Sequence, residues 1–271
     1  MTEKTAKKQE KSDPLADLWP GQSVALLKAL HILTHNGGLN ADSRRKLKQV
    51  QHLAQLIKPA IDAALKDKNQ PVLADLGAGK SYLGFILYDL YFATAGRGRV
   101  LAVETRADLV ATARKIAAQG GFERMDFVES RIAEARLGPV DIVTALHACD
   151  SATDEAILFA LAHDAKYVAL VPCCQAELAR TLEGSKGAMH QLWRHPIQRR
   201  EFGAHLTNVL RGLFLGAHGY KVRVTELTGL EHSLKNELIF AERHQRANPR
   251  ARAEFEKLAA EVGAAPKLLS F

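Results

Sequence analysis

The sequence predicts an α/β protein whose strands form a mostly parallel sheet. From residue 70 onward, short apolar runs alternate with stretches of helical spacing, which is typical of a parallel sheet with right-handed crossovers. The run at 72–74 is continuously apolar, as expected of a strand that is buried on both faces. Asp75 and a turn containing Gly77 and Gly79 follow this strand.

The glycine turn after the first strand predicts a binding site. Glycines let the backbone bend sharply and approach a ligand closely. Ligands of open α/β sheets lie beyond the carboxyl ends of the strands, where this turn is expected. The segment 71–84, PVLADLGAGKSYLG, is therefore the expected site of a small molecule.

The remaining elements follow in order along the chain. Turn residues and stretches of helical spacing separate the apolar runs from one another. The expected strands lie at 72–74, 99–103, 125–128, 140–146, 167–171, 222–227 and 238–241. The expected helical segments lie at 81–94, 107–119, 153–162, 176–219 and 250–262.

The sequence divides the chain into four segments. Residues 1–13 are polar and lysine-rich, so we expect a disordered basic tail. Residues 14–69 show apolar residues at helical spacing and form a helical N-terminal extension. Residues 70–245 form the ligand-binding domain, and residues 246–271 form a C-terminal helix.

The composition narrows the class of protein. The chain has 271 residues with 47% hydrophobic content, a net charge of +7 and three cysteines without a regular pairing pattern. The basic balance favours a polyanionic partner, and the cysteines imply no disulfide framework. No apolar run has the roughly 18–20 residues that a membrane span needs, and the N-terminus is too polar for a secretory signal. We therefore expect a cytoplasmic protein without a membrane partner.

Two phosphate-binding motifs fit the glycine turn only in part. A dinucleotide fingerprint G-x-G-x-x-G has its third position at Tyr82, and a P-loop has its leading glycine position at Ala74. A P-loop nucleotidase thus remains a minor alternative. The carboxylate of Asp75 would repel a phosphate, but it suits the cationic amino-acid end of a ligand.

The D-x-G-x-G arrangement resembles motif I of class I S-adenosylmethionine (SAM) methyltransferases, with Ser81 at the position of the usual third glycine. The resemblance implies SAM as cofactor and a Rossmann-like fold with a mostly parallel, seven-stranded sheet. Glu104 ends the second strand, where a carboxylate accepts hydrogen bonds from both ribose hydroxyls. Ser130 follows the third strand, where such enzymes often carry a carboxylate that holds the adenine amine.

The residues after the fourth and fifth strands are expected at the same mouth of the sheet. They include His147, Cys149, Asp150, Cys173 and Cys174. Thiols and imidazole can ligate zinc, but adjacent cysteines are not typical ligand spacing, so we expect no metal. The other interpretations are a thiolate nucleophile acting on a pyrimidine, or small buried packing residues.

A second resemblance concerns the segments LHACDSATDEAI and VPCCQ. They look like the family of methyltransferases that includes the eukaryotic tRNA acceptor-stem 2′-O-methyltransferases and related methyltransferase-like proteins. That family carries a His-x-Cys-Gly/Asp segment, a Thr-Asp pair, and a Cys-Cys pair followed by His or Tyr, a position that is Gln175 here. The resemblance covers roughly residues 47–243.

The resemblance implies methyl transfer to RNA, either tRNA or rRNA, with the ribose 2′-oxygen as one acceptor. His147, which is also placed beside the cofactor, and Asp150 are the candidate bases. Lys235 could polarise the hydroxyl or hold a phosphate, as could Lys186, and Cys173 is a candidate for the reaction itself. The Asp/Asn-Pro-Pro-aromatic signature of amino-group methylation is missing after the fourth strand.

Basic patches could bind the RNA. One patch groups Arg44, Arg45, Lys46 and Lys48, and another groups Trp193, Arg194, His195, Arg199 and Arg200. Arginine and aromatic groups suit phosphate pairing and base stacking, although a solvated face and a packing tryptophan are the alternatives. Other open alternatives are a methyltransferase of a protein side chain or small molecule, and a non-catalytic RNA-binding module with the same fold. The oligomeric state is left open.

Overall fold

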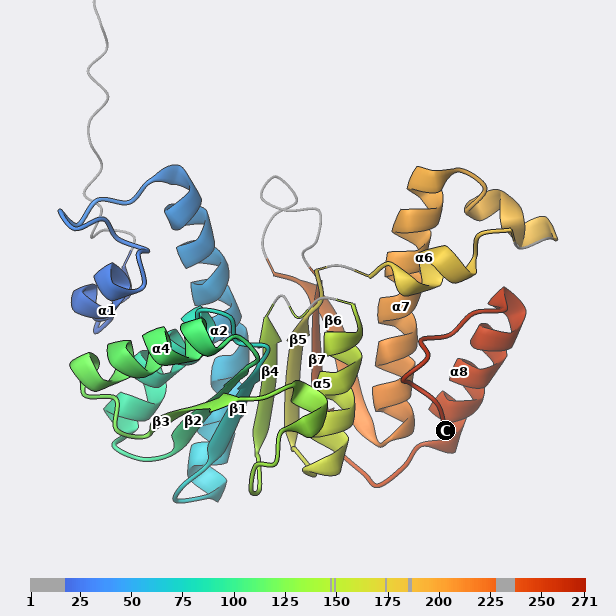
Figure 1. The fold of residues 1–271 in the computed structure, drawn as a ribbon. Helices are drawn as coiled ribbons and strands as arrows, with labels where there is room; N and C mark the ends of the chain where they lie inside the picture. Colours follow the sequence, from blue (N-terminus) through green and yellow to red (C-terminus); the bar gives the residue numbers. More distant parts are fainter. Residues whose placement is uncertain (1–17, 147, 149, 174, 185–186, 228–236) are drawn as a thin grey trace, which may run out of the picture.

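The structure of the protein is a computed structural model. It describes residues 18–271, apart from 147, 149, 174, 185–186 and 228–236. The tail expected at residues 1–13 lies outside the described residues. A single seven-stranded sheet runs through the centre of the molecule, with helices on both faces (Figure 1).

The sheet has the strand order β3-β2-β1-β4-β5-β7-β6. Neighbouring strands from β3 to β5 are parallel, while β7 is antiparallel to both β5 and β6. The strands are β1 (Val72–Leu76), β2 (Arg99–Glu104), β3 (Met125–Glu129), β4 (Ile142–Leu146), β5 (Tyr167–Val171), β6 (Tyr220–Glu226) and β7 (Glu237–Arg243). The predicted α/β fold with a mostly parallel, seven-stranded sheet is therefore confirmed.

The helices fall into two groups along the chain. Those before β3 are α1 (Val24–Ala29), α2 (Ala41–Asp67), α3 (Tyr82–Leu87), the π-helical turn η2 (Tyr88–Ala93) and α4 (Ala107–Gly120). Those after β3 are η3 (Ile132–Glu134), α5 (Ser151–Ala162), α6 (Glu177–Thr181), η4 (Ala188–Leu192), α7 (Pro196–Ala217) and α8 (Pro249–Val262).

The two groups of helices cover opposite faces of the sheet, and each face has its own hydrophobic core. The first core joins the apolar stripes of α2 and α4 to strand residues such as Leu73 and Val100. The second joins α5, α7 and α8 to strand residues such as Ala74 and Val143. Successive residues of β1 thus enter different cores, as the alternation of side chains along a strand requires.

Helix α2 is a layer of the fold rather than a separate appendage. Its residues Leu47, Leu53 and Ile57 are fully buried in the same core as the first face of the sheet. Pro59 lies inside this helix, which nevertheless continues to Asp67.

The segment at 176–219 is not one continuous helix. It divides into α6, η4 and α7 because the backbone between them takes positive φ at Gly184 and Gly187, and because Pro196 starts a new helix at its first turn. The sequence-based expectation of one long helical segment is corrected here to three pieces.

No helix in the described part of the chain is long and apolar enough to cross a membrane.

The close contact between α6 and α7 depends on Gly203. A Cβ atom at this position would lie 2.7 Å from the backbone nitrogen of Ala179 and 2.9 Å from its Cα. We predict that Gly203→Ala lowers the free energy of unfolding by about 1–3 kcal/mol, because backbone must move to admit the methyl group. Denaturant unfolding measures this change.

Gly212 in the same helix provides the matched control. A Cβ atom there would meet only Val222 Cγ1, at an ordinary 3.7 Å. Gly212→Ala should therefore raise the free energy of unfolding, by up to about 1 kcal/mol, through helix propensity. Equal effects of the two substitutions would contradict the close packing of α6 on α7.

Candidate active site

A cleft of about 510 Å³ opens at the carboxyl ends of β1 and β2. The turn after β1 and the residues that end β2 form one side of it, and residues after β3 and β4 form the other. Its lining includes Asp75, Gly77, Gly79, Glu104, Ser130, Ile132, Ala148, Ala152 and Glu155. The structure therefore brings together five of the six residues that were predicted to bind the cofactor. The sixth, His147, lies outside the described residues.

The turn after β1 bends at glycines. Gly77 and Gly79 have φ of 64° and 57°, in the left-handed region that glycine adopts without steric cost. Ser81, at the position of the usual third glycine, also has a left-handed φ of 54° and precedes the first residue of α3. At Gly77 and Gly79 the turn thus presents its backbone to the cleft without a side chain in the way.

Glu104 is held by the turn that it faces. Its Oε2 accepts a hydrogen bond from the Gly79 amide at 2.7 Å, and its Oε1 accepts from the amides of Thr105 and Arg106 at 3.0 and 3.1 Å. Burial acts to raise the pKa of Glu104, but hydrogen bonds from Arg106 and Gly79 outweigh it and leave this pKa below its ordinary value. The side chain is therefore a carboxylate at neutral pH.

Asp75 lies inside β1 and beneath the turn, with only 2% of its surface exposed. Its Oδ1 accepts a hydrogen bond from the Thr144 hydroxyl at 2.9 Å, and its Oδ2 accepts from the Gly84 amide at 3.2 Å. Burial raises the pKa of Asp75 to about 6, against the lowering effect of these two hydrogen bonds. Both oxygens already have protein partners, so the carboxylate links β1, β4 and α3.

Glu155 lines the cleft from α5, and the sequence analysis did not single it out. Ala152 precedes it by one helical turn and lines the same cleft, which places both residues on one face of α5. The signal in the sequence that could have identified Glu155 is its three-residue spacing from Ala152, at the start of the helix after β4. Ser130, which was singled out, lines the cleft with its hydroxyl donating to the Arg131 carbonyl at 2.9 Å.

Asp150 directly precedes α5, and its side chain contacts residues that follow β5. It has a positive φ of 50°, which is unusual for a residue with a side chain. Its Oδ1 accepts from the Ala176 amide at 3.3 Å and its Oδ2 lies 3.4 Å from Arg180. It lines a second hollow with Glu177 and Arg180, whereas it does not line the cleft beside Glu104.

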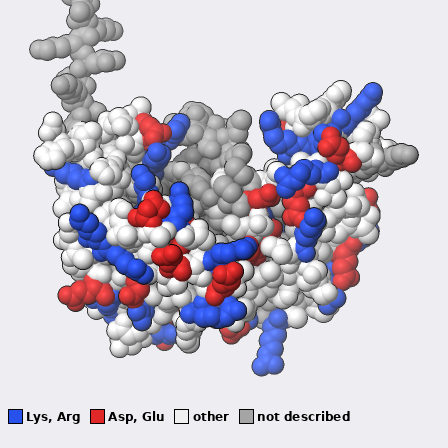
Figure 2. Space-filling model, in the orientation of Figure 1, with Lys and Arg blue, Asp and Glu red and all other residues white. Residues whose placement is uncertain are grey.

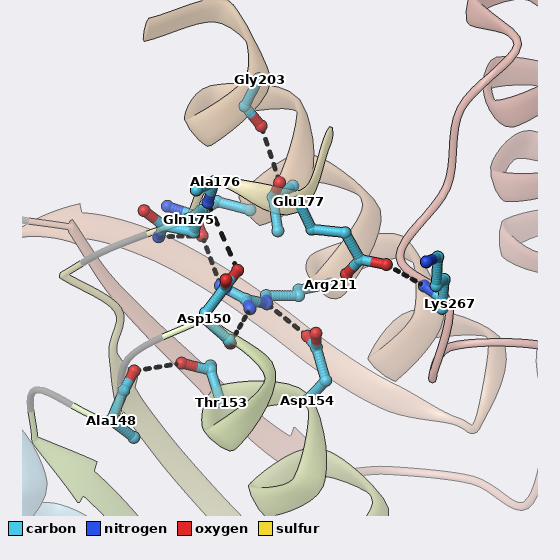
Figure 3. Close-up of polar contacts among 12 residues, drawn as sticks. Ala148, Asp150, Thr153, Asp154, Gln175, Ala176, Glu177, Gly203, Arg211 and Lys267 are labelled. Carbon is cyan, nitrogen blue, oxygen red and sulfur yellow. Dashed lines mark hydrogen bonds and ion pairs between the residues drawn. The ribbon is translucent and has the colours of Figure 1, made fainter. Parts of the chain in front are cut away.

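A buried ion pair supports this loop (Figure 3). Arg211 of α7 donates from Nε to Asp154 at 2.6 Å and from Nη2 to the Asp150 carbonyl at 2.8 Å. Both charged side chains are nearly inaccessible, at 1% and 2% exposure. Burial raises the pKa of Asp154, although the guanidinium of Arg211 acts to lower it.

The same network reaches β5 and β7. Asn208 Oδ1 accepts from Arg211 at 3.2 Å and from Gln175 Nε2 at 3.0 Å, and Asn208 Nδ2 donates to Glu237. Gln175 therefore joins this network. The ends of β4, β5 and β7 are tied together through one arginine and one asparagine.

Several predicted catalytic residues lie outside the described residues. These are His147 and Lys235, together with Cys149, Cys174 and Lys186. Cys173 is described: it follows β5 and Pro172, and it is half-buried. Among the residues that the structure describes, no three His, Cys, Asp or Glu side chains gather in a way that would hold a metal ion.

Trp193 is not a surface for stacking bases. It is 2% exposed and packs against Phe202, with ring centroids 4.8 Å apart. The packing alternative considered for this tryptophan is therefore the right one. Arg199 pairs with Glu183 at 2.8 Å, while Arg194 and Arg200 are exposed.

The fold and the cleft define a class of enzyme. The parallel sheet closed by an antiparallel β7, the glycine turn after β1 and the carboxylate at the end of β2 form the Rossmann-like arrangement of class I SAM-dependent methyltransferases. A family model described as a methyltransferase domain matches residues 45–181, just over half of the chain. The chain belongs to this methyltransferase-domain family and uses SAM.

Solved structures with a related fold are known, although their sequences are distant. A Podospora anserina methyltransferase with bound S-adenosylhomocysteine (SAH) has 12% identity and a TM-score of 0.48, covering 90% of this chain and 100% of its own. A magnesium protoporphyrin IX methyltransferase from Synechocystis has 14% identity and a TM-score of 0.48, covering 81% and 93%. An rRNA methylase from Streptococcus thermophilus has 13% identity and a TM-score of 0.44, covering 72% and 94%. No curated protein matches the chain.

The raised pKa of Asp75 makes a prediction about stability. This pKa is about 6 in the folded protein and near 3.8 in the unfolded chain, so between these values the folded state holds a proton that the unfolded state has released. The contribution of Asp75 to the free energy of unfolding should therefore fall as the pH rises from about 4 to about 6, and stay level above that.

Asp75→Asn removes the ionisation and keeps the shape. Denaturant unfolding of both proteins between about pH 4 and about pH 7 measures the difference in their free energies of unfolding. We expect the wild type to lose stability relative to the variant as the pH rises through this window. A difference that does not change with pH would contradict the burial of an ionisable Asp75.

Proposed function

We propose that the cleft binds SAM with its ribose at Glu104 and that the chain transfers the methyl group to RNA. SAM supplies a methyl group bound to a positively charged sulfur. Glu104 would accept hydrogen bonds from the two ribose hydroxyls, as a carboxylate at this strand end does in related sheets. The amides of Thr105 and Arg106 would keep one of its oxygens in position.

Two features of the described residues fit this cofactor. Cβ atoms added at Gly77 or Gly79 would find no atom closer than 3.8 Å, so the turn leaves room for a ligand against its backbone. The carboxylates beside the cleft suit a ligand with a cationic end and hydroxyl donors. Asp75 would act through the turn that it holds and through its negative charge beneath the amino-acid end of SAM.

RNA is the proposed acceptor because of the charge around the mouth of the sheet. The chain has a net charge of +7. Figure 2 shows Lys and Arg side chains over the upper end of α2 and over the α6–α7 region. Arg194 and Arg200 are exposed there and form no ion pair with another described residue, so both are available to phosphates.

Exposed apolar side chains accompany these cations. Met189, Leu192 and Ile197 are about half-exposed within one short stretch of η4 and α7. Cations beside apolar groups suit a strand of RNA, whose phosphates pair with arginine and whose bases contact apolar surface. In contrast, the exposed cations of α2 are partly neutralised, since Arg45 and Lys46 both pair with Asp42.

The proposed reaction is methylation of an RNA hydroxyl, with the ribose 2′-oxygen as one acceptor. In that reaction His147 would remove the hydroxyl proton and Lys235 would hold the neighbouring phosphate. Asp150 would position the loop that carries His147 rather than act as the base, because its carboxylate faces Ala176 and Arg180. A role of Cys173 as nucleophile, and a protein or small-molecule acceptor, remain the alternatives.

Glu104 provides the test of the cofactor site. We predict that Glu104→Ala weakens the binding of SAH by at least about tenfold, because the ribose hydroxyls lose a charged acceptor. Isothermal titration calorimetry measures this affinity. Glu129→Ala is the control, since this carboxylate ends the neighbouring β3 but does not line the cleft. Unchanged affinity in the Glu104 variant would rule out the proposed ribose site.

The exposed cations of η4 and α7 provide the test of RNA binding. We predict that the double variant R194E/R200E binds bulk tRNA at least about tenfold more weakly than the wild type and lowers the slope of log affinity against log salt by about 2. Fluorescence anisotropy at several salt concentrations measures both quantities.

A variant with the same change of charge controls for net charge alone. R250E/K257E reverses two exposed cations on α8 and should leave tRNA affinity close to that of the wild type. An affinity that does not depend on salt, or equal losses in the two double variants, would argue against a specific RNA surface on η4 and α7.

A further inference from the structure

We propose that three cations at the mouth of the cofactor cleft bind consecutive phosphates of the RNA, so that the RNA strand lies across the mouth while the cofactor is bound. The cations are Lys80, Arg106 and Arg131, which we call the rim cations. This inference rests on the proposed function and adds to it a second RNA-binding surface and an order of binding. SAM enters before the RNA binds, and SAH leaves after the RNA has left.

The charged groups of the cleft are separated by depth. Among the described residues that line it, six are charged, of which three are carboxylates and three are the rim cations. The carboxylates lie inside, since Asp75 is 2% exposed and the side chains of Glu104 and Glu155 are 11% and 16% exposed. The rim cations lie outside, since Lys80 is exposed and the two arginine side chains are 63% and 64% exposed. The carboxylates can therefore face the cofactor, whereas the rim cations reach the solvent.

The strand order brings the rim cations side by side. They follow β1, β2 and β3, which are neighbours in the sheet. In the register of β2 and β3, Glu104 pairs with Glu129. Arg106 and Arg131 each lie two residues beyond that pair. Arg106 also extends toward the turn after β1, because a Cβ atom at Gly79 would lie 3.8 Å from its Nη2.

The cofactor supplies less negative charge than the rim cations need. SAM has no phosphate and a single carboxylate, so it offers one negative charge to three cations. Lys80 forms no ion pair with another described residue. Arg131 lies 3.8 Å from Glu155 and 3.9 Å from Glu134, and both distances exceed hydrogen-bond length. Arg106 donates to the carboxylate that ends β2, at 3.3 Å, so two of the three rim cations lack a close partner.

A strand of RNA can supply the missing negative charge. Neighbouring strands of a sheet lie about 4.8 Å apart, so the ends of β1, β2 and β3 span about 10 Å, which a few consecutive phosphates cover. The rim cations line the cleft and also face the solvent, so a strand that pairs with them lies over the mouth. The cofactor cannot pass through the mouth while that strand is bound, and this sets the order of binding.

The test measures how fast SAH leaves the protein with and without saturating bulk tRNA. Release of tritiated SAH into an excess of unlabelled SAH gives one rate for each condition. The ratio of the two rates removes any effect of a variant on the contacts of the cofactor alone. We expect tRNA to slow the release from the wild type by about tenfold or more, because the bound strand blocks the mouth. K80E/R131E should release SAH equally fast with and without tRNA.

Two control variants separate the charge at the rim from other effects. K80R/R131K keeps both charges and should keep the ratio of the wild type. R250E/K257E makes the same change of charge as K80E/R131E, but on α8, which does not line the cleft, so it should also keep the ratio. Arg106 stays unchanged in all variants because it donates to Glu104. Thermal unfolding confirms that each variant is folded.

The outcomes separate this inference from the proposed function. If the wild type binds tRNA but releases SAH equally fast with and without it, the role of the rim cations is wrong and the proposed function stands. The same conclusion follows if K80E/R131E keeps the full ratio, or if K80R/R131K loses it. If the wild type does not bind tRNA, the proposed function and the inference both fail.

Discussion

Two carboxylates hold the turn after β1, and the cleft depends on them. Asp75 accepts from the Gly84 amide beyond the turn, while Glu104 accepts from the Gly79 amide within it. The turn needs such support because a glycine can adopt many backbone conformations. Gly77 and Gly79 must both be held in the left-handed one. Asp75 and Glu104, which the sequence links to the cofactor, thus also have a structural role. They keep the backbone of the turn open toward the ligand.

A second constraint lies across the sheet from this turn. The buried pair of Arg211 and Asp154 holds the carbonyl of Asp150, and Asn208 extends the network to Gln175 and Glu237. A buried ion pair contributes little net stability by itself, but the loss of one partner leaves an uncompensated charge. We interpret this network as the frame that holds Asp150 and the start of α5 against α7.

Local patterns in the sequence were sufficient for the fold and for part of the cleft. The apolar runs, the glycine turn and Glu104 all depend on neighbours close in the chain, and the structure places them as predicted. The role of Asp75 in the packing of the turn depends on Thr144, which lies 69 residues away. The orientation of α5, the burial of Trp193 and the division of the segment at 176–219 likewise depend on tertiary contacts. Sequence spacing alone could not predict them.

A crystal structure of the complex with SAH is the sharpest test of the cofactor site. We expect SAH in the cleft beside the glycine turn, with its ribose hydroxyls on Glu104. Density for SAH at another place in the molecule, or a ribose without contact to Glu104, would rule out this cofactor site.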